Sequence, residues 1–286
     1  MRMSSQIGQV LRRGLTLARA EIPARIRNFV FDIDGCLAVD GEPIPGAFET
    51  LATLRERGYG FVFLTNDSYL STAAWQAKAI TLGFDFPDLV VITAGQILVQ
   101  LAADRYPGGK VLLFGSEALG REAEALGLKL LPTERGHEAD VVLVARSPSF
   151  DYDDMTAGLR ALRAGAGFIT SSMARAIPSK GGPVPGTGAT TQAMAFASRR
   201  RATIAGKPSA LAARVCLQIA GFNREHTAFV GDDVELDIAT AKRVGAFSIL
   251  VLTGATRIEE VPQLRPLLVP DLVMDSVADV PRMLWG

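Results

Sequence analysis

Short apolar runs alternate with amphipathic stretches along most of the 286-residue chain. The runs are rich in Val, Ile, Leu and Phe and predict buried strands, whereas stretches with apolar positions three and four apart predict helices. Strands that alternate with helices in this way are typical of a parallel α/β sheet. The fold class expected from the pattern is therefore α/β.

The predicted elements fall into three consecutive parts. Predicted strands end at Asp32 or cover Gly60–Leu64, Lys110–Phe114, Asp140–Val144, Gly167–Thr170, Thr203–Ala205, Thr227–Val230, Ser248–Leu252 and Asp271–Met274. Predicted helices cover Ala47–Arg57, Gln96–Arg105, Ala118–Leu126, Tyr152–Ala164 and Ile238–Val244, with one more that ends near Leu82 and one that ends at Ala220.

Two segments rich in Gly and Pro divide these parts. The first is Pro107-Gly108-Gly109, and the second is Pro178–Gly188, which is predicted to be a loop. The first and last parts of the chain both show short apolar strands that alternate with helices and end in polar residues. We expect residues 27–106 and 203–286 to form one α/β core domain, with residues 107–202 inserted as a second α/β domain.

Residues 1–26 are expected to form an N-terminal helical extension. Their apolar positions fall close to a helical stripe, and arginines precede the first acidic residue, Glu21. A basic, acid-poor amphipathic segment is also compatible with a transit peptide or a membrane-surface helix. It lacks the continuous apolar core of a secretory signal, and we expect a helix docked on the core domain.

The composition excludes several classes of protein. Hydrophobic residues make up 48% and charged residues 21%, which is a globular composition, and a formal net charge of zero argues against binding nucleic acid by phosphate neutralisation. The spacing of Cys36 and Cys216 suggests neither a disulfide framework nor a zinc site, so a reducing, cytoplasmic setting is expected. No apolar run approaches the roughly 20 residues that a membrane span needs.

Two carboxylates follow the first predicted strand. Asp32 and Asp34 are two residues apart, so both side chains start on the same side of the extended backbone. They repel each other unless a cation lies between them or one of them holds a proton. The alternative is an ordinary turn, because Asp and Gly are common turn residues for local reasons.

Polar residues also follow three other predicted strands. In an open α/β sheet, ligands bind outside the carboxyl ends of the strands. Phosphoryl transfer needs a nucleophilic carboxylate, a proton carrier, hydrogen-bond donors, a cation for the phosphoryl oxygens and carboxylates for Mg²⁺. The four strand ends supply these types of residue in Asp32/Asp34, Thr65/Asn66, Lys207 and Asp232/Asp233.

In these residues the chain resembles the phosphatases of the haloacid dehalogenase superfamily. The matching motifs are Asp32-Ile33-Asp34-Gly35, Leu64-Thr65-Asn66-Asp67, Gly206-Lys207-Pro208-Ser209, and Val230-Gly231-Asp232-Asp233 followed by Asp237-Ile238. The chain is most similar to the class IIA branch, the NagD-like and p-nitrophenylphosphatase-like proteins, from about residue 27 to the end. The resemblance implies a Rossmann-like core with an inserted α/β cap of the C2 type.

The resemblance also implies the roles of the motif residues. Asp32 is expected to be the nucleophile, Asp34 the general acid/base and Lys207 a third catalytic residue. Mg²⁺ is expected to be bound by the Asp32 carboxylate, Asp34 through its main-chain carbonyl, and Asp232. The residues expected to hold the phosphoryl group are Thr65, Asn66, Lys207 and Gly35. Asp233 and Asp237 are expected to orient Lys207 or metal-bound water.

The inserted domain departs from its relatives at two places. Arg146 stands near a position where relatives often have a glycine and an acidic residue, and Arg175 stands next to the place of a lost acidic residue. Two arginines that face the site would favour a substrate with a second anionic group. The alternative is that both point into solvent.

The leading functional hypothesis is a Mg²⁺-dependent phosphatase for a small phosphomonoester such as a sugar phosphate or nucleotide. Dehalogenation is disfavoured by Asp34 and Asp232, which suit metal-dependent phosphoryl chemistry. A phosphomutase and a catalytically silent ligand-binding or scaffold protein are the alternatives. The family resemblance is compatible with a homodimer, and neither nucleic acid nor a membrane is expected as a partner.

Overall fold

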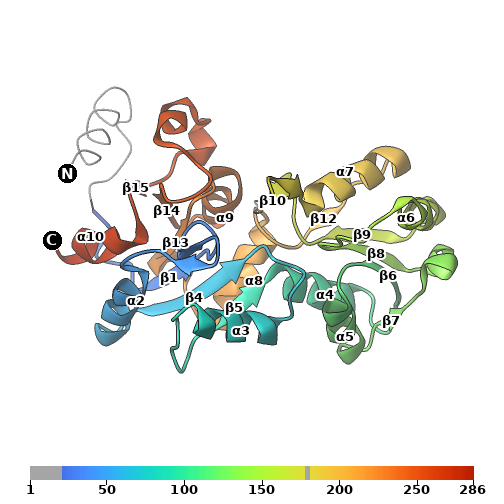
Figure 1. Cartoon of the computed structure of the whole chain (residues 1–286), viewed down its shortest axis with the longest axis horizontal. Coiled ribbons are helices and arrows are strands. Elements are labelled where there is room, and N and C mark those ends of the chain that lie inside the picture. The colour runs from blue at the N-terminus through green and yellow to red at the C-terminus, as the bar shows by residue number, and fades with distance from the viewer. Residues whose placement is uncertain (1–20, 178–180) are drawn as a thin grey trace. The chain divides into compact units, whose positions relative to one another are not determined.

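The computed structural model describes residues 21–177 and 181–286, and Figure 1 shows the ribbon. The predicted helix within residues 1–26 lies almost entirely outside the described residues. The chain divides into two compact units, one with residues 21–65, 76–91 and 213–286, the other with residues 66–75 and 92–212. The predicted domain limits remain a prediction. Among the described residues, no helix is both long and apolar enough to span a bilayer.

The first unit contains most of a six-stranded sheet. Its strands, in spatial order, are β15 (Leu272–Met274), β14 (Phe247–Val251), β13 (Thr227–Gly231), β1 (Asn28–Phe31), β4 (Gly60–Thr65) and β5 (Val91–Thr93). The central pairs are parallel, and Phe31 lies opposite both Val230 and Phe63. The predicted strands of this sheet are confirmed, except that β5 was not predicted.

The central strand β1 forms because its sequence is apolar on both faces. Phe29, Val30 and Phe31 are all buried, as expected of a strand covered on both sides in a parallel sheet. The Asp32 N–H then donates a hydrogen bond to the carbonyl of Val230 at 2.9 Å. This bond fixes the point at which the chain leaves the sheet.

The second unit is built on a five-stranded sheet. Its strands, in spatial order, are β12 (Thr203–Ile204), β9 (Gly167–Thr170), β8 (Val141–Val144), β6 (Lys110–Phe114) and β7 (Lys129–Leu130), with parallel pairing throughout. The prediction of a second α/β sheet in the middle of the chain is confirmed.

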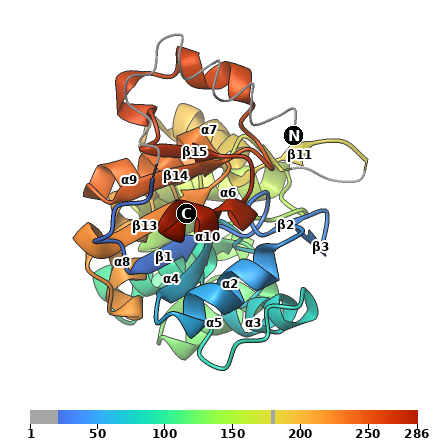
Figure 2. The ribbon, with the colours of Figure 1, turned by 90° about the vertical axis from the view of Figure 1, so that its left-hand side faces the viewer.

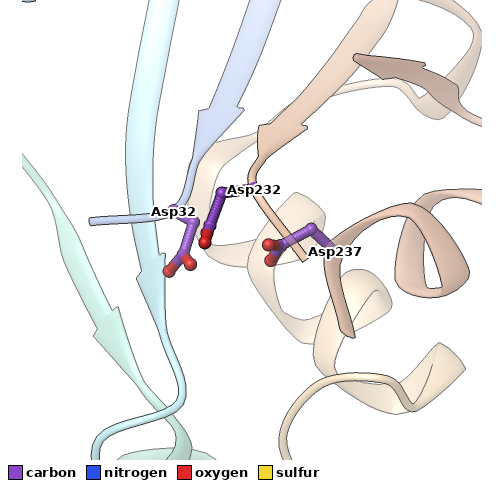
Figure 3. A group of neighbouring side chains, drawn as sticks. All are labelled: Asp32, Asp232 and Asp237. Atoms are coloured by element: carbon purple, nitrogen blue, oxygen red, sulfur yellow. The ribbon is translucent and has the colours of Figure 1, made fainter. Parts of the chain in front are cut away.

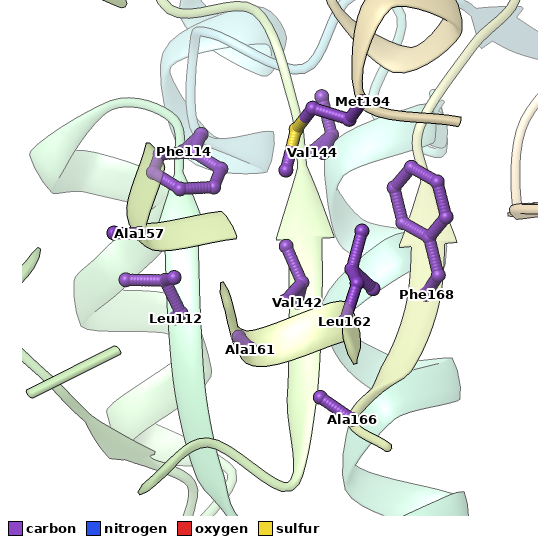
Figure 4. Packing of buried hydrophobic residues seen from close by; sticks show 10 residues of the cluster. All are labelled: Leu112, Phe114, Val142, Val144, Ala157, Ala161, Leu162, Ala166, Phe168 and Met194. Atoms are coloured by element: carbon purple, nitrogen blue, oxygen red, sulfur yellow. The ribbon is translucent and has the colours of Figure 1, made fainter. Parts of the chain in front are cut away.

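Helices cover both faces of this second sheet (Figure 1). On one face, α6 (Tyr152–Ala164) and α7 (Thr187–Ser198) close an apolar core, shown in Figure 4. The core residues are Leu112, Phe114, Val142, Val144, Ala157, Ala161, Leu162, Ala166, Phe168 and Met194. The other face carries α4 (Ala94–Arg105) and α5 (Glu117–Ala125). The carboxyl ends of the strands in this second sheet are followed by loops.

The remaining elements are short helices and two-stranded hairpins. The helices are α2 (Ala47–Glu56), α3 (Thr72–Thr81), α8 (Ala210–Ala220), α9 (Ala239–Val244) and α10 (Val280–Trp285), and the hairpins are β2 (Ala38–Val39) with β3 (Glu42–Pro43) and β10 (Ala176–Ile177) with β11 (Val184–Pro185). In the first unit α10 lies beside α2, as Figure 2 shows.

The prediction that Pro178–Gly188 is entirely loop is wrong. Strand β11 occupies Val184–Pro185, and α7 begins at Thr187 directly after Gly186. Glycine and proline hid the start of this helix, because both residues disfavour a helix interior although a helix can begin right after them. The predicted helix at Ile238–Val244 begins as α-helix only at Ala239, after a π-helical turn over Val234–Ile238.

Candidate active site

Three carboxylates gather at the carboxyl ends of neighbouring strands in the first unit. Asp32 follows β1, Asp232 follows β13, and Asp237 comes from the π-helical turn after β13 (Figure 3). Each offers one oxygen, and these oxygens lie within 4.8 Å of one another. Asp232 and Asp237 are only 5% and 3% exposed, whereas Asp32 is half-buried. We call these three residues the acidic group.

Local hydrogen bonds orient the carboxylate of Asp237 in the acidic group. Asp233 caps the π-helical turn, because its Oδ1 accepts from the N–H groups of Glu235 at 2.7 Å and Leu236 at 3.1 Å. The N–H of Asp233 donates to Oδ2 of Asp237 at 3.1 Å. Asp233 therefore both starts the turn that carries Asp237 and orients its carboxylate.

Glycines make the space that the acidic group occupies. A Cβ atom at Gly35 would lie 2.3 Å from an oxygen of Asp232, and one at Gly254 would lie 2.0 Å from the same oxygen. A Cβ atom at Gly231 would lie 2.2 Å from Cγ of Asp237. These contacts are too short for any side chain, so three glycines admit the two buried carboxylates.

The acidic group fits a hard divalent cation. Carboxylates this close repel one another, and a cation among them removes that repulsion. Carboxylate oxygens are the ligands that Mg²⁺ and Ca²⁺ prefer in proteins. The N–H of Ala255 holds Oδ2 of Asp232 at 2.6 Å, so one carboxylate is already fixed in direction.

Asp34 is not a member of the acidic group, and its side chain is exposed. The chain turns back on itself here, since the carbonyl of Ile33 accepts from the N–H groups of Leu37 and Ala38, both at 2.9 Å. Gly35 takes a φ of +89° within this turn, a conformation that favours glycine. Thr65, at the end of β4, is buried.

In the second unit, the side chain of Asn66 holds the main chain of Lys207. Its Oδ1 accepts from the Lys207 N–H at 2.8 Å, and its Nδ2 donates to the Lys207 carbonyl at 3.1 Å and to Oγ of Ser172 at 3.2 Å. Lys207 is only 3% exposed. Both donors and one lone pair of the Asn66 amide are thus engaged in positioning, a role that the sequence did not predict.

Gly206 makes this close approach feasible. A Cβ atom at Gly206 would lie 2.4 Å from the carbonyl oxygen of Ser171 and 2.7 Å from Oδ1 of Asn66. The Gly206 N–H donates to the same Ser171 carbonyl at 2.8 Å. The glycine before Lys207 is therefore required by packing, whatever the lysine binds.

The two arginines singled out in the sequence lie in different surroundings. Arg146 follows β8 and is half-buried, with its guanidinium carbon 5.7 Å from the ring centre of Tyr69. Its N–H donates to Oγ of the buried Ser68 at 3.0 Å. Arg175 is exposed, directly before β10.

Within each unit the structure brings part of the predicted set together. The first unit joins Asp32, Asp232 and Asp237, and the second joins Asn66 and Lys207. Sequence reasoning missed the hydroxyls of Ser68, Ser171 and Ser172 and the role of Gly254. The missed residues share one signal, since each follows a strand at its carboxyl end.

Comparison with known proteins gives a consistent result. Residues 29–129 match a family model described as haloacid dehalogenase-like hydrolase, and residues 204–280 match a second model described as HAD-hydrolase-like. Glycerol-3-phosphate phosphatase of Homo sapiens is 32% identical over 95% of this chain and 95% of its own length.

Two of the solved structures with the same fold are described as phosphatases. A 4-nitrophenylphosphatase from Thermotoga maritima superposes with a TM-score of 0.84 at 31% identity, over 91% of this chain and 98% of its own. A glycerol phosphate phosphatase from Mycobacterium tuberculosis, in complex with magnesium, has a TM-score of 0.81 at 28% identity, over 91% of this chain and 76% of its own. The predicted Rossmann-like fold with a cap is confirmed, and hydrolysis is favoured over a phosphomutase or a silent scaffold.

Proposed function

The chain belongs to the haloacid dehalogenase-like hydrolases and is a phosphoric monoester hydrolase, and from this premise we propose that it hydrolyses small phosphomonoesters with Mg²⁺ and an aspartyl-phosphate intermediate. The observation that carries the proposal is the acidic group at the ends of β1 and β13. It combines a half-buried carboxylate that can attack phosphorus with two buried carboxylates.

In the first half of the proposed reaction, a carboxylate oxygen of Asp32 attacks the phosphorus atom. The bond between phosphorus and the ester oxygen breaks, and Asp34 gives its proton to the leaving alkoxide. The exposed side chain of Asp34 suits this exchange, because it can regain a proton from water.

In the second half, water hydrolyses the aspartyl-phosphate. Asp34 takes a proton from the attacking water, and the phosphorus–oxygen bond to Asp32 breaks to release inorganic phosphate and the free carboxylate. The phosphoryl oxygens are proposed to be held by Thr65, Gly35 and the Lys207 ammonium, with Asn66 holding the lysine's backbone in place.

We propose that Asp32, Asp232 and the main-chain carbonyl of Asp34 hold Mg²⁺, with Asp233 and Asp237 orienting it or its water. When bound, this ion would offset the repulsion between the anionic nucleophile and the anionic phosphate. Asp237 is supported in this role by its place in the acidic group, and Asp233 by its hydrogen bond to Asp237.

The relatives' names suggest the size of the substrate. They act on glycerol 3-phosphate and 4-nitrophenyl phosphate, so a small phosphomonoester is proposed here. We also propose that the protein is cytoplasmic, that it forms a homodimer, and that it does not bind nucleic acid. The zero net charge supports the absence of nucleic acid. Light scattering of the purified chain measures its oligomeric state.

The substitution Asp32→Asn tests the nucleophile. Hydrolysis of 4-nitrophenyl phosphate and glycerol 3-phosphate is expected to fall about a thousandfold or more, because an amide cannot form the intermediate. Excess EDTA should abolish hydrolysis by the unmodified protein, and added Mg²⁺ should restore it. Asp85→Asn, an exposed aspartate in the same unit, is the matched control and should keep full activity. Full activity of Asp32→Asn would overturn the proposed mechanism.

A further inference from the structure

We propose that Arg146 forms a second anion-binding subsite, so that the preferred substrates are phosphomonoesters that also carry a carboxylate. This inference rests on the proposed phosphatase function and adds the substrate class. The contacts that support it all lie within the second unit.

One short segment runs along the carboxyl ends of four strands of the second sheet. The side chain of Asn66 forms hydrogen bonds with the backbone of Lys207, which follows β12, and with the hydroxyl of Ser172, which follows β9. Ser68 Oγ accepts from the hydroxyl of Ser171 at 2.9 Å and from the N–H of Arg146, which follows β8.

The last residue of this segment, Tyr69, is hydrogen-bonded at the end of the next strand, β6. The carbonyl of Tyr69 accepts from Oγ of Ser116, which follows β6, at 2.6 Å. The order of these contacts, β12, β9, β8 and β6, is the spatial order of the strands in the sheet (Figure 1). The segment 66–69 therefore fixes Lys207 and Arg146 along one line.

The sheet sets the spacing between the two cations. The strands β12 and β8 are separated by β9, so their carboxyl ends lie two strand spacings, about 10 Å, apart. Lysine and arginine side chains are long enough to shorten this gap. A phosphoryl group at Lys207 and a second anion at Arg146 would thus be joined by a carbon skeleton of a few bonds.

Arg146 keeps its positive charge available. The Tyr69 ring attracts the guanidinium without neutralising it, and the arginine forms no ion pair with a carboxylate in the described part of the chain. Arg135, in the same unit, shows the contrasting case, because its Nε and one terminal nitrogen each lie 2.7 Å from a carboxylate oxygen of Glu138.

The subsite is also fixed in position. Ser68 and Ser171, which anchor the backbone of Arg146, are 1% and 0% exposed, so the start of the side chain is held rigidly. The planar guanidinium presents paired donors that match the two oxygens of a carboxylate. A half-buried, aromatic-backed arginine at the carboxyl edge of a sheet is placed as a ligand group rather than as a solvated surface charge.

Two esters with the same carbon skeleton test the inference. Glycerol 3-phosphate ends in a neutral hydroxymethyl group, and 3-phosphoglycerate ends in a carboxylate at the same position. We expect a higher kcat/KM for 3-phosphoglycerate with the unmodified protein. In Arg146→Ala the ratio of kcat/KM values should fall about thirtyfold or more, mainly through KM, because the substrate carboxylate loses its charged partner.

Further variants separate charge and geometry from general damage. Arg146→Lys should recover part of the ratio, since it keeps the charge but not the paired donors. Arg146→Gln is a second neutral variant, and turnover of glycerol 3-phosphate by each variant reports whether the fold is intact. Arg160→Ala, an exposed arginine on α6, is the matched control and should leave the ratio unchanged.

The two proposals fail in different ways. Hydrolysis of both esters with a ratio that Arg146→Ala does not change would overturn the anion subsite and leave the phosphatase function standing. Absence of phosphate release from either ester, with Mg²⁺ present, would overturn the proposed function and the subsite with it.

Discussion

The carboxyl edges of the two sheets are built by opposite means. At the first sheet, the acidic group occupies a small volume, and glycines stand where a Cβ atom would collide with two of its carboxylates. At the second sheet, the segment 66–69 is tied down by hydroxyl and amide hydrogen bonds to the ends of four strands.

This difference shows two ways in which a parallel sheet can present polar groups. The first edge gathers carboxylates, which need a cation among them to offset their repulsion. It also depends on the small space that the neighbouring glycines leave for these carboxylates. At the second edge, short polar side chains hold the backbone in place, and we propose that Lys207 and Arg146 bind the ligand there. Changes in volume should therefore damage the first edge, and lost hydrogen bonds should damage the second.

Among the substitutions that test this difference between the two edges, Asn66→Ala is expected to have the largest effect. The side chain holds both backbone polar groups of Lys207, so its loss should displace the lysine and lower kcat/KM for 4-nitrophenyl phosphate by about a hundredfold. Steady-state kinetics measures the loss. Gln100→Ala removes an exposed amide from α4 and should have no effect. Unchanged kinetics in Asn66→Ala would show that the tether is dispensable.

A smaller effect is expected from Gly254→Ala at the first edge. The new methyl group must displace the Asp232 carboxylate, which should weaken the activation by Mg²⁺ by about tenfold. The Mg²⁺ dependence of the rate measures this shift. At Gly181 a Cβ atom meets open space, so Gly181→Ala should leave the Mg²⁺ dependence alone. Equal behaviour of the two variants would contradict the role assigned to volume.

The smallest effect on the reaction is expected from Ser68→Ala, which acts on stability. The half-buried N–H of Arg146 and the buried hydroxyl of Ser171 lose their acceptor, and the free energy of unfolding should fall by about 1–3 kcal/mol. Denaturation in urea measures the change. Ser149→Ala, at an exposed position after the same strand, should be neutral. If Ser68→Ala were as stable as the unmodified protein, the hydrogen bonds of Ser68 would not help to hold segment 66–69.

Most strands of both sheets could be predicted from the sequence, because a buried strand is recognised from its own local run of apolar residues. The apolar run of β1 and the strands β6, β8 and β9 are visible as continuous Val, Ile, Leu and Phe residues. The carboxylates Asp32 and Asp232 stand out because both are expected at the carboxyl ends of parallel strands, where ligands bind.

What the sequence did not reveal depends on residues that are distant along the chain. Nothing near Gly254 indicates that it touches Asp232, and the acceptor role of Ser68 exists only because β8 and β9 end beside it. Helix α7 was missed for a local reason, since its Thr-Gly start follows a glycine- and proline-rich segment. Arg146 was noticed as a departure from relatives, but its tyrosine partner was not.

The four outermost strands of the two sheets have a further consequence. The strands β15 and β5 are three residues long, and β12 and β7 are two residues long, whereas β1, β4, β6, β8, β9, β13 and β14 are all longer. A long edge strand offers a row of unpaired backbone groups on which a foreign chain can add, and short edges remove that template. We therefore expect the folded protein to resist fibril growth and strand exchange at high concentration.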